Sequence, residues 1–309
     1  MTVADPPAPR VRRSRAPGTL AWLGAIPLGV WMLLFFLLPF GLIVWYSFGY
    51  KPDIYSTVSN DQLSLGRYAQ ALSPAFLQIF WRTLGIAVIG TVIAGLIAYP
   101  MAYWMAVVVP PRWRGLVLAL VLVPYWTNFL VRTLGWSVLL SGSGPLSTAL
   151  QAAGGQPLAV LNTSGAVQLG VVYNYLPLMI LPIYVALDRL DPRLLEASRD
   201  LGANAVRTFW RITLPLSAPG VTAGTLLVFV PLMGDYITPA VLGGAKGSMV
   251  GQMVAGQFTN AQNWALGSAM AILLMVAIFG VTAIAGAVVR GLSWTLSRAT
   301  RLVPLGGRA

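Results

Sequence analysis

The chain has 309 residues, of which 57% are hydrophobic and 9% are charged. About a quarter of the residues of a soluble domain carry charge, so this composition excludes an ordinary soluble domain and indicates a membrane protein. The absence of cysteine and histidine excludes disulfide scaffolds, thiol nucleophiles, histidine acid–base catalysis and the usual zinc sites, and we expect no cofactor. The net charge of +12 must then be explained by membrane topology or by an anionic partner.

Long uncharged stretches divide the chain, because a charge at the centre of a bilayer is costly. A helix needs about 20 apolar residues to cross about 30 Å of hydrocarbon. The uncharged stretches therefore predict six transmembrane helices, near residues 20–48, 83–109, 115–140, 165–187, 218–242 and 265–290. The segment between the third and fourth predicted spans, residues 141–164, is also uncharged but rich in Gly, Ser and Pro. This composition predicts a loop with a short interfacial helix around Leu146–Ala152.

The distribution of basic residues predicts the orientation. Fifteen of the twenty Lys and Arg residues lie in the N-terminal tail, the 110–114 turn, the 188–217 loop and the C-terminal tail. Basic loops favour the cytoplasmic side, so both termini are expected in the cytoplasm. The charge excess thus records topology and contact with lipid headgroups, and it requires no nucleic-acid partner. We expect a disordered basic tail over residues 1–19, one helical domain over residues 20–290 and a second cytoplasmic tail over residues 291–309.

The loop between the fourth and fifth spans is the one long amphipathic segment. Asp191 can cap a helix whose first position is Pro192, and Gly202 is placed to end that helix in a left-handed conformation. A second short helix is expected to begin after Asn204 and to end at Pro215. Its buried side would consist of Val206, Phe209, Trp210 and Ile212. From this pattern alone, an amphipathic connector resting on lipid headgroups explains the loop as well as a docking site for a soluble protein does.

The residue types and spacing within residues 188–217 are specific. Glu196-Ala197-Ser198 is followed by Gly202 and, after nine further residues, by Ile212-Thr213-Leu214-Pro215. This pattern resembles the EAA motif of permease subunits of bacterial type I ABC importers, with Ser198 where alanine is usual. The resemblance implies a coupling loop that docks into a groove of a separate, dimeric ATP-hydrolysing subunit. The residues that it assigns to this interface are Glu196, Ala197, Ser198, Gly202, Leu214 and Pro215.

The sequence contains no phosphate-binding loop of the G-x-x-x-x-G-K-[ST] type. The nearest string, Gly243-Gly244-Ala245-Lys246-Gly247-Ser248, lacks the glycine before the lysine and falls outside the cytoplasm in the predicted topology. We therefore expect that this chain is not an enzyme and that ATP is hydrolysed on the partner subunit.

Two ionisable residues fall inside predicted spans, Arg132 in the third and Asp235 in the fifth. Charges at such depth are candidates for a substrate pathway, and a structural ion pair between the two spans is the alternative. Pro231, Gly234 and Pro239 predict a broken helix around Asp235. The aromatic candidates could form cation–π contacts with a cationic substrate. The candidate pathway residues are Trp126, Asn128, Arg132, Asn174, Tyr175, Asp235 and Tyr236.

Two further features concern the fourth and fifth spans. Asn174, Tyr175, Pro177 and Pro182 predict that the fourth span is interrupted as well. Gly220 and Gly224, four residues apart, predict that the fifth span packs closely against a neighbouring helix. Interrupted helices around a polar lumen would make a translocation path.

Two strings extend the resemblance beyond the loop, WTNFLVRT at residues 126–133 and GDYITPAVLGG at residues 234–244. They resemble the first permease subunit of spermidine/putrescine importers, and the likeness runs over about residues 20–290. It implies the type I ABC importer permease fold, a place in the bacterial inner membrane, a second permease subunit, two ATPase subunits and an extracytoplasmic binding protein that delivers a polyamine. Permeases for opines, thiamine or iron are the nearest alternative. A stand-alone secondary transporter and a passive membrane scaffold are the alternatives from other classes.

Overall fold

The computed structural model describes the backbone of residues 19–301 and the side chains of residues 26–287. Apart from one isolated antiparallel bridge between Tyr50 and Ser59, the described residues hold only helices, turns and irregular loops. The all-helical membrane fold expected from the sequence is confirmed. Nearly all of the predicted tail 1–19, and residues 302–309 of the predicted C-terminal tail, lie outside the described residues.

The first half of the chain contains the helices up to the fourth predicted span. It comprises α1 (Thr19–Met32), the π-helical stretch η1 (Leu33–Leu37), α2 (Leu38–Tyr46), α3 (Gly66–Ala71), α4 (Pro74–Tyr103), the π-helical stretch η2 (Trp104–Val108), α5 (Pro111–Trp126), α6 (Phe129–Leu140), α7 (Pro145–Ala152) and α8 (Ser164–Asp188). The short α7 confirms the helix predicted between the third and fourth spans.

The second half begins with the amphipathic loop. It comprises α9 (Pro192–Asp200), α10 (Ala205–Thr208), the π-helical stretch η3 (Phe209–Thr213), α11 (Leu214–Met233), the π-helical stretch η4 (Pro239–Gly243), α12 (Val250–Thr259) and α13 (Trp264–Arg301). The last helix thus extends eleven residues past the predicted end of the sixth span at residue 290.

Five of the six predicted spans are helical stretches long and apolar enough to cross a membrane. These are Ile26–Tyr46, Pro74–Val108, Ser164–Asp188, Ala205–Met233 and Trp264–Ala287. The sixth candidate is a pair of helical segments, Pro111–Trp126 and Phe129–Ala152, which meet at an angle of 85°. The span predicted near residues 115–140 is thus a bent pair of helices, and with it the structure has up to six candidate spans among the described residues.

The bend between α5 and α6 has a local cause. Thr127 adopts an extended conformation with ψ of 152° and ends α5. The Asn128 side-chain oxygen then accepts hydrogen bonds from the backbone N–H groups of Leu130 at 2.8 Å and Val131 at 3.4 Å, which is the geometry of an N-cap. Asn128, predicted as a pathway residue, thus begins α6.

The predicted interruption of the fourth span is wrong, because α8 is continuous from Ser164 to Asp188. Pro177 is buried in the helix interior, and Pro182 lies against Gly220 of α11. A Cβ atom on Gly220 would lie 2.5 Å from the Pro182 carbonyl oxygen, so the predicted close packing at this glycine is confirmed. Neighbouring helices packed this tightly can hold a proline-containing helix together.

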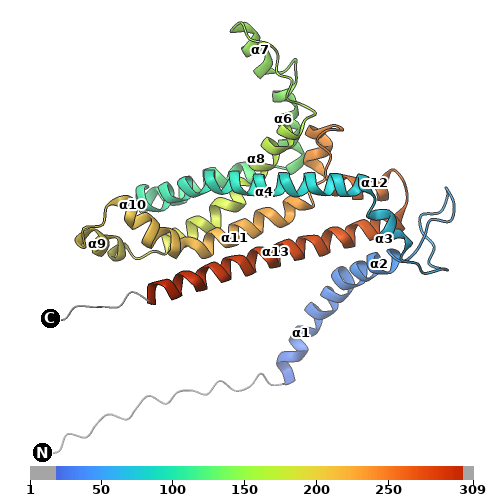
Figure 1. Cartoon of the computed structure of the whole chain (residues 1–309), viewed down its shortest axis with the longest axis horizontal. Coiled ribbons are helices and arrows are strands. Elements are labelled where there is room, and N and C mark those ends of the chain that lie inside the picture. Colours follow the sequence, from blue (N-terminus) through green and yellow to red (C-terminus); the bar gives the residue numbers. More distant parts are fainter. Residues whose placement is uncertain (1–18, 302–309) are drawn as a thin grey trace, which may run out of the picture.

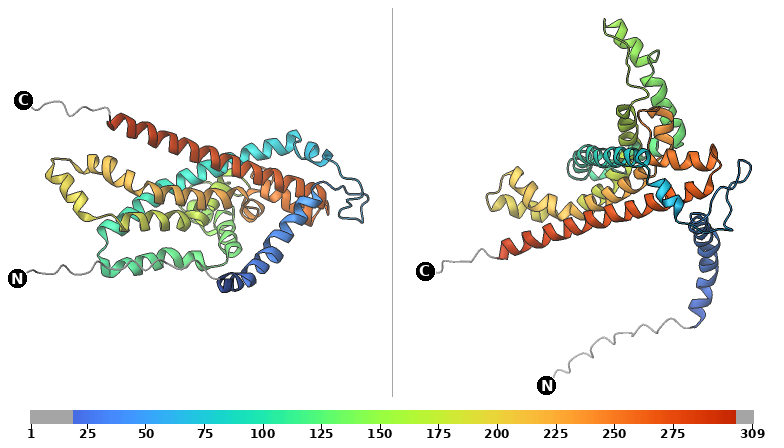
Figure 2. Two further views of the ribbon diagram at one scale, coloured as in Figure 1. Left: turned by 90° about the horizontal axis from the view of Figure 1, so that it is seen from below. Right: turned by 45° about the vertical axis from the view of Figure 1, so that its right-hand side comes forward.

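Helix α8 packs against both α4 and α11, and these helices run side by side with α13 (Figure 1). Their contacts bury small side chains such as Ala94 and Ala98 of α4 together with Met179 and Ile183 of α8 and Leu232 of α11. The first helix and the α6–α7 segment project from this bundle in different directions (Figure 2). Helices α9 and α10 lie at one end of the bundle, and α3 and α12 lie at the other (Figure 1).

Candidate functional site

The amphipathic loop begins and turns as its sequence predicts. The Asp191 carboxylate accepts a hydrogen bond from the Arg193 N–H at 3.0 Å, and Pro192 occupies the first position of α9. Gly202 has a φ of +77° and its N–H donates to the Arg199 carbonyl at 2.8 Å. The next N–H donates to the Ser198 carbonyl at 3.0 Å, which completes a Schellman motif. The predicted arrangement of helix, glycine turn and helix is confirmed.

Ser198, the position that departs from the EAA pattern, has a specific contact. Its hydroxyl lies 2.8 Å from the Thr208 hydroxyl of α10, and both side chains are 7% exposed. The Asn204 side chain caps α10 by accepting from the Arg207 N–H at 2.8 Å. An alanine at position 198 could not make the cross-helix hydrogen bond, so the serine connects α9 to α10. Thr208 was not among the predicted site residues, because its partner depends on the fold of the turn.

The second helix of the loop does not end at Pro215. Helical structure continues from Ala205 to Met233. In η3 the Leu214 N–H donates to the Phe209 carbonyl, which lies five residues back instead of the four of an α-helix. This shift of one residue in the hydrogen-bond pattern falls directly before Pro215, which has no N–H to donate. The prediction that proline terminates this helix is therefore wrong, and the loop is joined to α11 without a break.

The predicted apolar side of this helix is only partly buried. Phe209 and Ile212 are half-buried, whereas Val206 is 65% exposed and Trp210 is 62% exposed, which corrects the prediction for these two residues. The small Thr208 and Thr213 occupy the buried positions instead. Hydrophobicity alone could not distinguish a side that faces the bundle from one that faces lipid or another chain.

The six residues of the EAA-like pattern occupy three environments. Glu196, Ala197 and Gly202 are exposed at the tip of the loop, near the 45% exposed Leu194. Ser198 is buried in the contact described above. Leu214 and Pro215 lie at the base of α11, away from that tip. The exposed part of the loop therefore offers a surface, and the remainder holds its shape.

The fifth span breaks at Asp235, as predicted. Helix α11 ends at Met233, and the Asp235 carboxylate accepts hydrogen bonds from the N–H groups of Ile237 at 3.0 Å and Thr238 at 3.1 Å. The Thr238 hydroxyl donates to the same carboxylate at 2.6 Å. Asp235 is only 5% exposed. Its carboxylate thus caps the helical turn that leads into η4, a role that the proline positions alone did not indicate.

Arg132 and Asp235 do not pair with each other. In the described part of the chain the one ion pair joins Arg114 to Asp188 at 2.6 Å. The Arg132 guanidinium lies 5.3 Å from the Tyr125 ring centroid and 5.6 Å from that of Phe129, and its buried Nε has no hydrogen-bond partner. Arg132 is therefore held by aromatic faces and not by a carboxylate from the described residues.

Tyr175 and Asn174 connect α8 to the start of α6. The Tyr175 ring lies 5.9 Å from the Phe129 ring, and the Tyr175 side chain faces Asp235. The Asn174 amide nitrogen donates to the Thr133 hydroxyl at 3.1 Å, while its buried oxygen has no partner. Thr133 was missed because its partner lies 41 residues further along the chain. The structure thus brings Arg132, Asn174, Tyr175 and Asp235 into one polar cluster, which we call the α6–α8 cluster.

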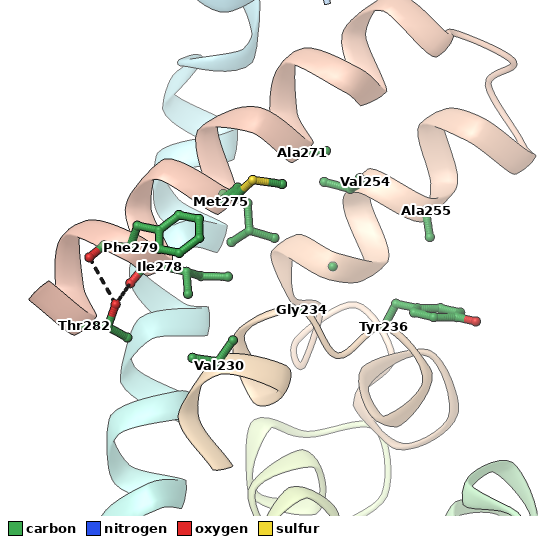
Figure 3. Close-up of a pocket in the computed structure, with 12 residues that line it drawn as sticks. Val230, Gly234, Tyr236, Val254, Ala255, Ala271, Met275, Ile278, Phe279 and Thr282 are labelled. Atoms are coloured by element: carbon green, nitrogen blue, oxygen red, sulfur yellow. Dashed lines mark hydrogen bonds between the residues drawn. The ribbon is translucent and has the colours of Figure 1, made fainter. Parts of the chain in front are cut away.

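Three predicted pathway residues lie outside the α6–α8 cluster: Asn128, which caps α6, and Trp126 and Tyr236. Trp126 is 78% exposed at the end of α5. Tyr236 is 52% exposed and lines an apolar cavity of about 430 Å³ between the end of α11, α12 and α13 (Figure 3). A Cβ atom on Gly251 of α12 would lie 2.5 Å from the Gly234 carbonyl oxygen, so α12 packs directly on the break in the fifth span. Asp235 and Tyr236, adjacent in sequence, therefore face different surroundings.

The glycine-rich string after η4 is a structural turn. Arg82, near the start of α4, donates to the Lys246 carbonyl at 2.8 Å, and the Thr83 hydroxyl accepts from the Val250 N–H at 2.9 Å. The Ser164 hydroxyl also donates to the Lys246 carbonyl, at 2.9 Å. These bonds fix the turn between η4 and α12 at the end of the bundle opposite to α9.

Known transport proteins are similar to this chain in sequence and in fold. Residues 98–294 match the family described as binding-protein-dependent transport system inner membrane component. The spermidine/putrescine transport system permease protein PotB of Haemophilus influenzae is 42% identical over 248 residues, which cover 80% of this chain and 86% of that protein. PotB of Escherichia coli is 37% identical over 248 residues, which cover 80% of this chain and 89% of that protein. The resemblance drawn from the two strings and the loop is confirmed.

Solved structures agree with the fold at low sequence identity. A chain of a bacterial ABC transporter involved in the import of the acidic polysaccharide alginate has a TM-score of 0.71 at 16% identity, covering 88% of this chain and 95% of that chain. A chain of the MetNI methionine ABC transporter in an inward-facing conformation has a TM-score of 0.54, covering 71% of this chain and 99% of that chain. Together with the sequence matches, these findings establish that the chain is a multi-pass permease that belongs to the binding-protein-dependent transport system inner membrane component family.

Proposed function

We propose that the chain is one permease subunit of a polyamine importer in the bacterial inner membrane, with both termini in the cytoplasm. The two PotB relatives are named for spermidine and putrescine transport, and their identity with this chain extends over four-fifths of its length. The observation that carries the proposal is Asp235, the one of the eight acidic residues that lies in the interior of a predicted span. A buried carboxylate at a helix break is a suitable attractor for an ammonium group.

The surroundings of the break suit both parts of a polyamine. Ammonium groups can approach the Asp235 carboxylate and the aromatic faces of Tyr125 and Tyr175, which stabilise cations. The methylene segments can pack against the apolar cavity beside Tyr236. In this proposal an extracytoplasmic binding protein delivers the polyamine to a path formed with a second permease subunit.

The loop is proposed to couple ATP binding and hydrolysis on a separate ATPase dimer to movement of the permease. Glu196 and the apolar Leu194 and Leu201, of which Leu201 is 88% exposed, provide a docking surface at the loop tip. The continuous helix from Ala205 to Met233 joins this loop to the break at Asp235. When ATP binding closes the ATPase dimer, movement of the loop would open the path outward, and hydrolysis would reset it.

Two substitutions at the loop tip test the coupling. We expect Glu196→Lys or Gly202→Asp to lower both spermidine uptake and substrate-stimulated ATP hydrolysis at least ten-fold in vesicles that hold the complete importer. The first change alters the docking charge, and the second places a side chain at a φ of +77°. Asp61→Lys, an exposed charge reversal outside the loop, is the control. Wild-type rates in both loop variants would contradict the coupling role.

Asp235→Asn tests the pathway. Asparagine keeps an oxygen for the two backbone N–H groups and removes the charge, so the helix cap persists while attraction for ammonium groups is lost. We expect uptake of labelled spermidine to fall at least ten-fold, with Asp61→Asn as the matched control. Unchanged flux in Asp235→Asn and in Arg132→Ala would favour a passive scaffold. Uptake without any ATPase subunit would favour a secondary transporter.

Arg132 supports a second candidate. Its guanidinium has no carboxylate partner in the described part of the chain and lies in the same cluster as Asp235. An unpaired cation favours a solute with a carboxylate, such as an opine, over a purely cationic polyamine. The affinity of the cognate binding protein for spermidine, putrescine, opines, thiamine and iron distinguishes the candidates. Preferential binding of an opine would replace the polyamine proposal and leave the permease assignment intact.

A further inference from the structure

An apolar groove of about 480 Å³ runs along the bundle near the amphipathic loop. One wall is α4 from Thr91 to Pro100, and the other is the helix formed by η3 and α11 from Phe209 to Thr225. The α4 wall spans ten residues and is about 14 Å long at 1.5 Å per residue, close to half of a hydrocarbon core of about 30 Å. The α4 wall of the groove is therefore about as long as one lipid leaflet is deep.

Aromatic side chains gather at the loop end of this groove. The ring centroids of Tyr99 and Phe209 are 5.6 Å apart, and the Tyr99 hydroxyl lies 2.8 Å from the Ser217 hydroxyl. Trp210 is 62% exposed beside them, and Leu96 on the facing wall is 70% exposed. Tyr and Trp side chains of this kind concentrate at the level of lipid headgroups. The loop end of the groove thus has the composition of a membrane interface, and the other end is lined by the small side chains of Thr91, Val92, Val221 and Thr225.

Two arginines flank the same end. Arg207 lies three residues before Trp210, and Arg211 follows it directly. Trp210 lines the groove at its loop end, so both arginines lie within three residues of a groove-lining side chain. Both arginines are exposed, and neither is within ion-pair distance of an acidic group in the described part of the chain. Unpaired guanidinium groups at the level of headgroups attract phosphate.

We propose that this groove holds an acyl chain of an anionic phospholipid whose phosphate binds Arg207 and Arg211. The apolar walls and the depth of one leaflet select a lipid chain, and the two arginines select an anionic headgroup. The bound lipid contacts both α4 and η3, which connects the loop to α11. The site is separate from the substrate path and does not depend on the identity of the solute.

Quenching by brominated lipids tests occupancy of the groove. The full-length chain is reconstituted into phosphatidylcholine vesicles with one-tenth phosphatidylglycerol, and either the first or the second lipid carries dibrominated acyl chains. The contribution of Trp210 is the difference between the wild-type chain and Trp210→Phe. Trp104→Phe is the matched control, because Trp104 is 49% exposed on η2 and lies outside the groove. We expect quenching of Trp210 per brominated lipid to be at least three-fold stronger for phosphatidylglycerol, and that of Trp104 to be equal for both lipids.

Variants that change charge test the role of the two arginines, and a variant that changes side-chain volume tests the role of the groove. Arg207→Gln with Arg211→Gln should abolish the preference for phosphatidylglycerol at Trp210. Arg112→Gln, which changes an exposed arginine in the first turn of α5, should retain it. Val92→Phe adds bulk to the groove wall and should lower quenching of Trp210 by both lipids.

Two results would overturn the proposal. The first is equal quenching of Trp210 by both brominated lipids in the wild-type chain, which would mean ordinary bilayer contact. The second is loss of the quenching when the chain is assembled with its partner subunits, which would mean that a protein surface covers the groove.

Discussion

Asp191 and Asp235 each begin a helical segment by accepting a hydrogen bond from the backbone N–H two residues further on, at 3.0 Å in both cases. Asp191 does so at the exposed start of α9, whereas Asp235 is 5% exposed between α11 and η4. The two residues thus make the same local contact in the loop and in the broken span. What differs is whether water can reach the backbone groups that they satisfy.

Because of this difference in access to water, losing the cap costs less free energy in the loop than at the break in the fifth span. Water can replace the Asp191 carboxylate, so the loop can change shape at little cost. No water is available to backbone groups in an apolar interior, where each unsatisfied group costs several kcal/mol. The loop is therefore suited to being moved by another protein, and the break at Asp235 is suited to staying fixed while a substrate passes.

The largest expected effect follows from removing the buried cap. Asp235→Ala leaves the Ile237 and Thr238 N–H groups and the Thr238 hydroxyl without their acceptor. We expect a loss of roughly 3 kcal/mol or more of unfolding free energy, at about 1 kcal/mol or more for each orphaned group. Thermal unfolding of the purified chain in detergent measures this change. Asp235→Asn, which can still accept from the backbone, should lose much less, and equal losses in the two variants would contradict the capping role.

An intermediate effect is expected at the contact between α9 and α10. Ser198→Ala restores the usual residue of the EAA pattern but leaves the buried Thr208 hydroxyl without its partner, at a cost of about 1 to 2 kcal/mol. Faster hydrogen exchange of the α9 and α10 amides would report this cost. Adding Thr208→Val removes the orphaned hydroxyl and should recover most of the loss. If the double variant exchanged faster than Ser198→Ala, the hydrogen bond would not be the cause.

The loop was more predictable from sequence than the spans, because caps are local. Asp191, Gly202 and Asn204 act on groups within three residues of themselves, and their roles were visible without knowledge of the fold. The bend at Asn128 was not foreseen, because an uncharged stretch gives the length of a span and not its direction. The continuity of α8 at Pro177 depends on helices packed against it, which no local rule describes.

For the α6–α8 cluster, the sequence predicted which residues matter but not which residues they contact. Arg132 and Asp235 were found because charges within spans are rare. Their partners depend on distant segments, as Asn174 shows by bonding to Thr133. The exposure of Trp210 was missed for another reason: in a membrane, an apolar residue can face the core, lipid or a second subunit with the same hydrophobicity.

The smallest expected effect is at the exposed cap. Asp191→Ala removes one acceptor from the Arg193 N–H, which water can then reach, so the loss of unfolding free energy should be about 1 kcal/mol. Thermal unfolding under the conditions used for Asp235→Ala gives the comparison, and Asp191→Asn should be close to the wild-type chain because asparagine also caps helices. A loss as large as that of Asp235→Ala would mean that the start of α9 is covered in the folded protein. The two regions would then differ in sequence position but not in their access to water, and the loop would not be the easily moved element that a coupling role requires.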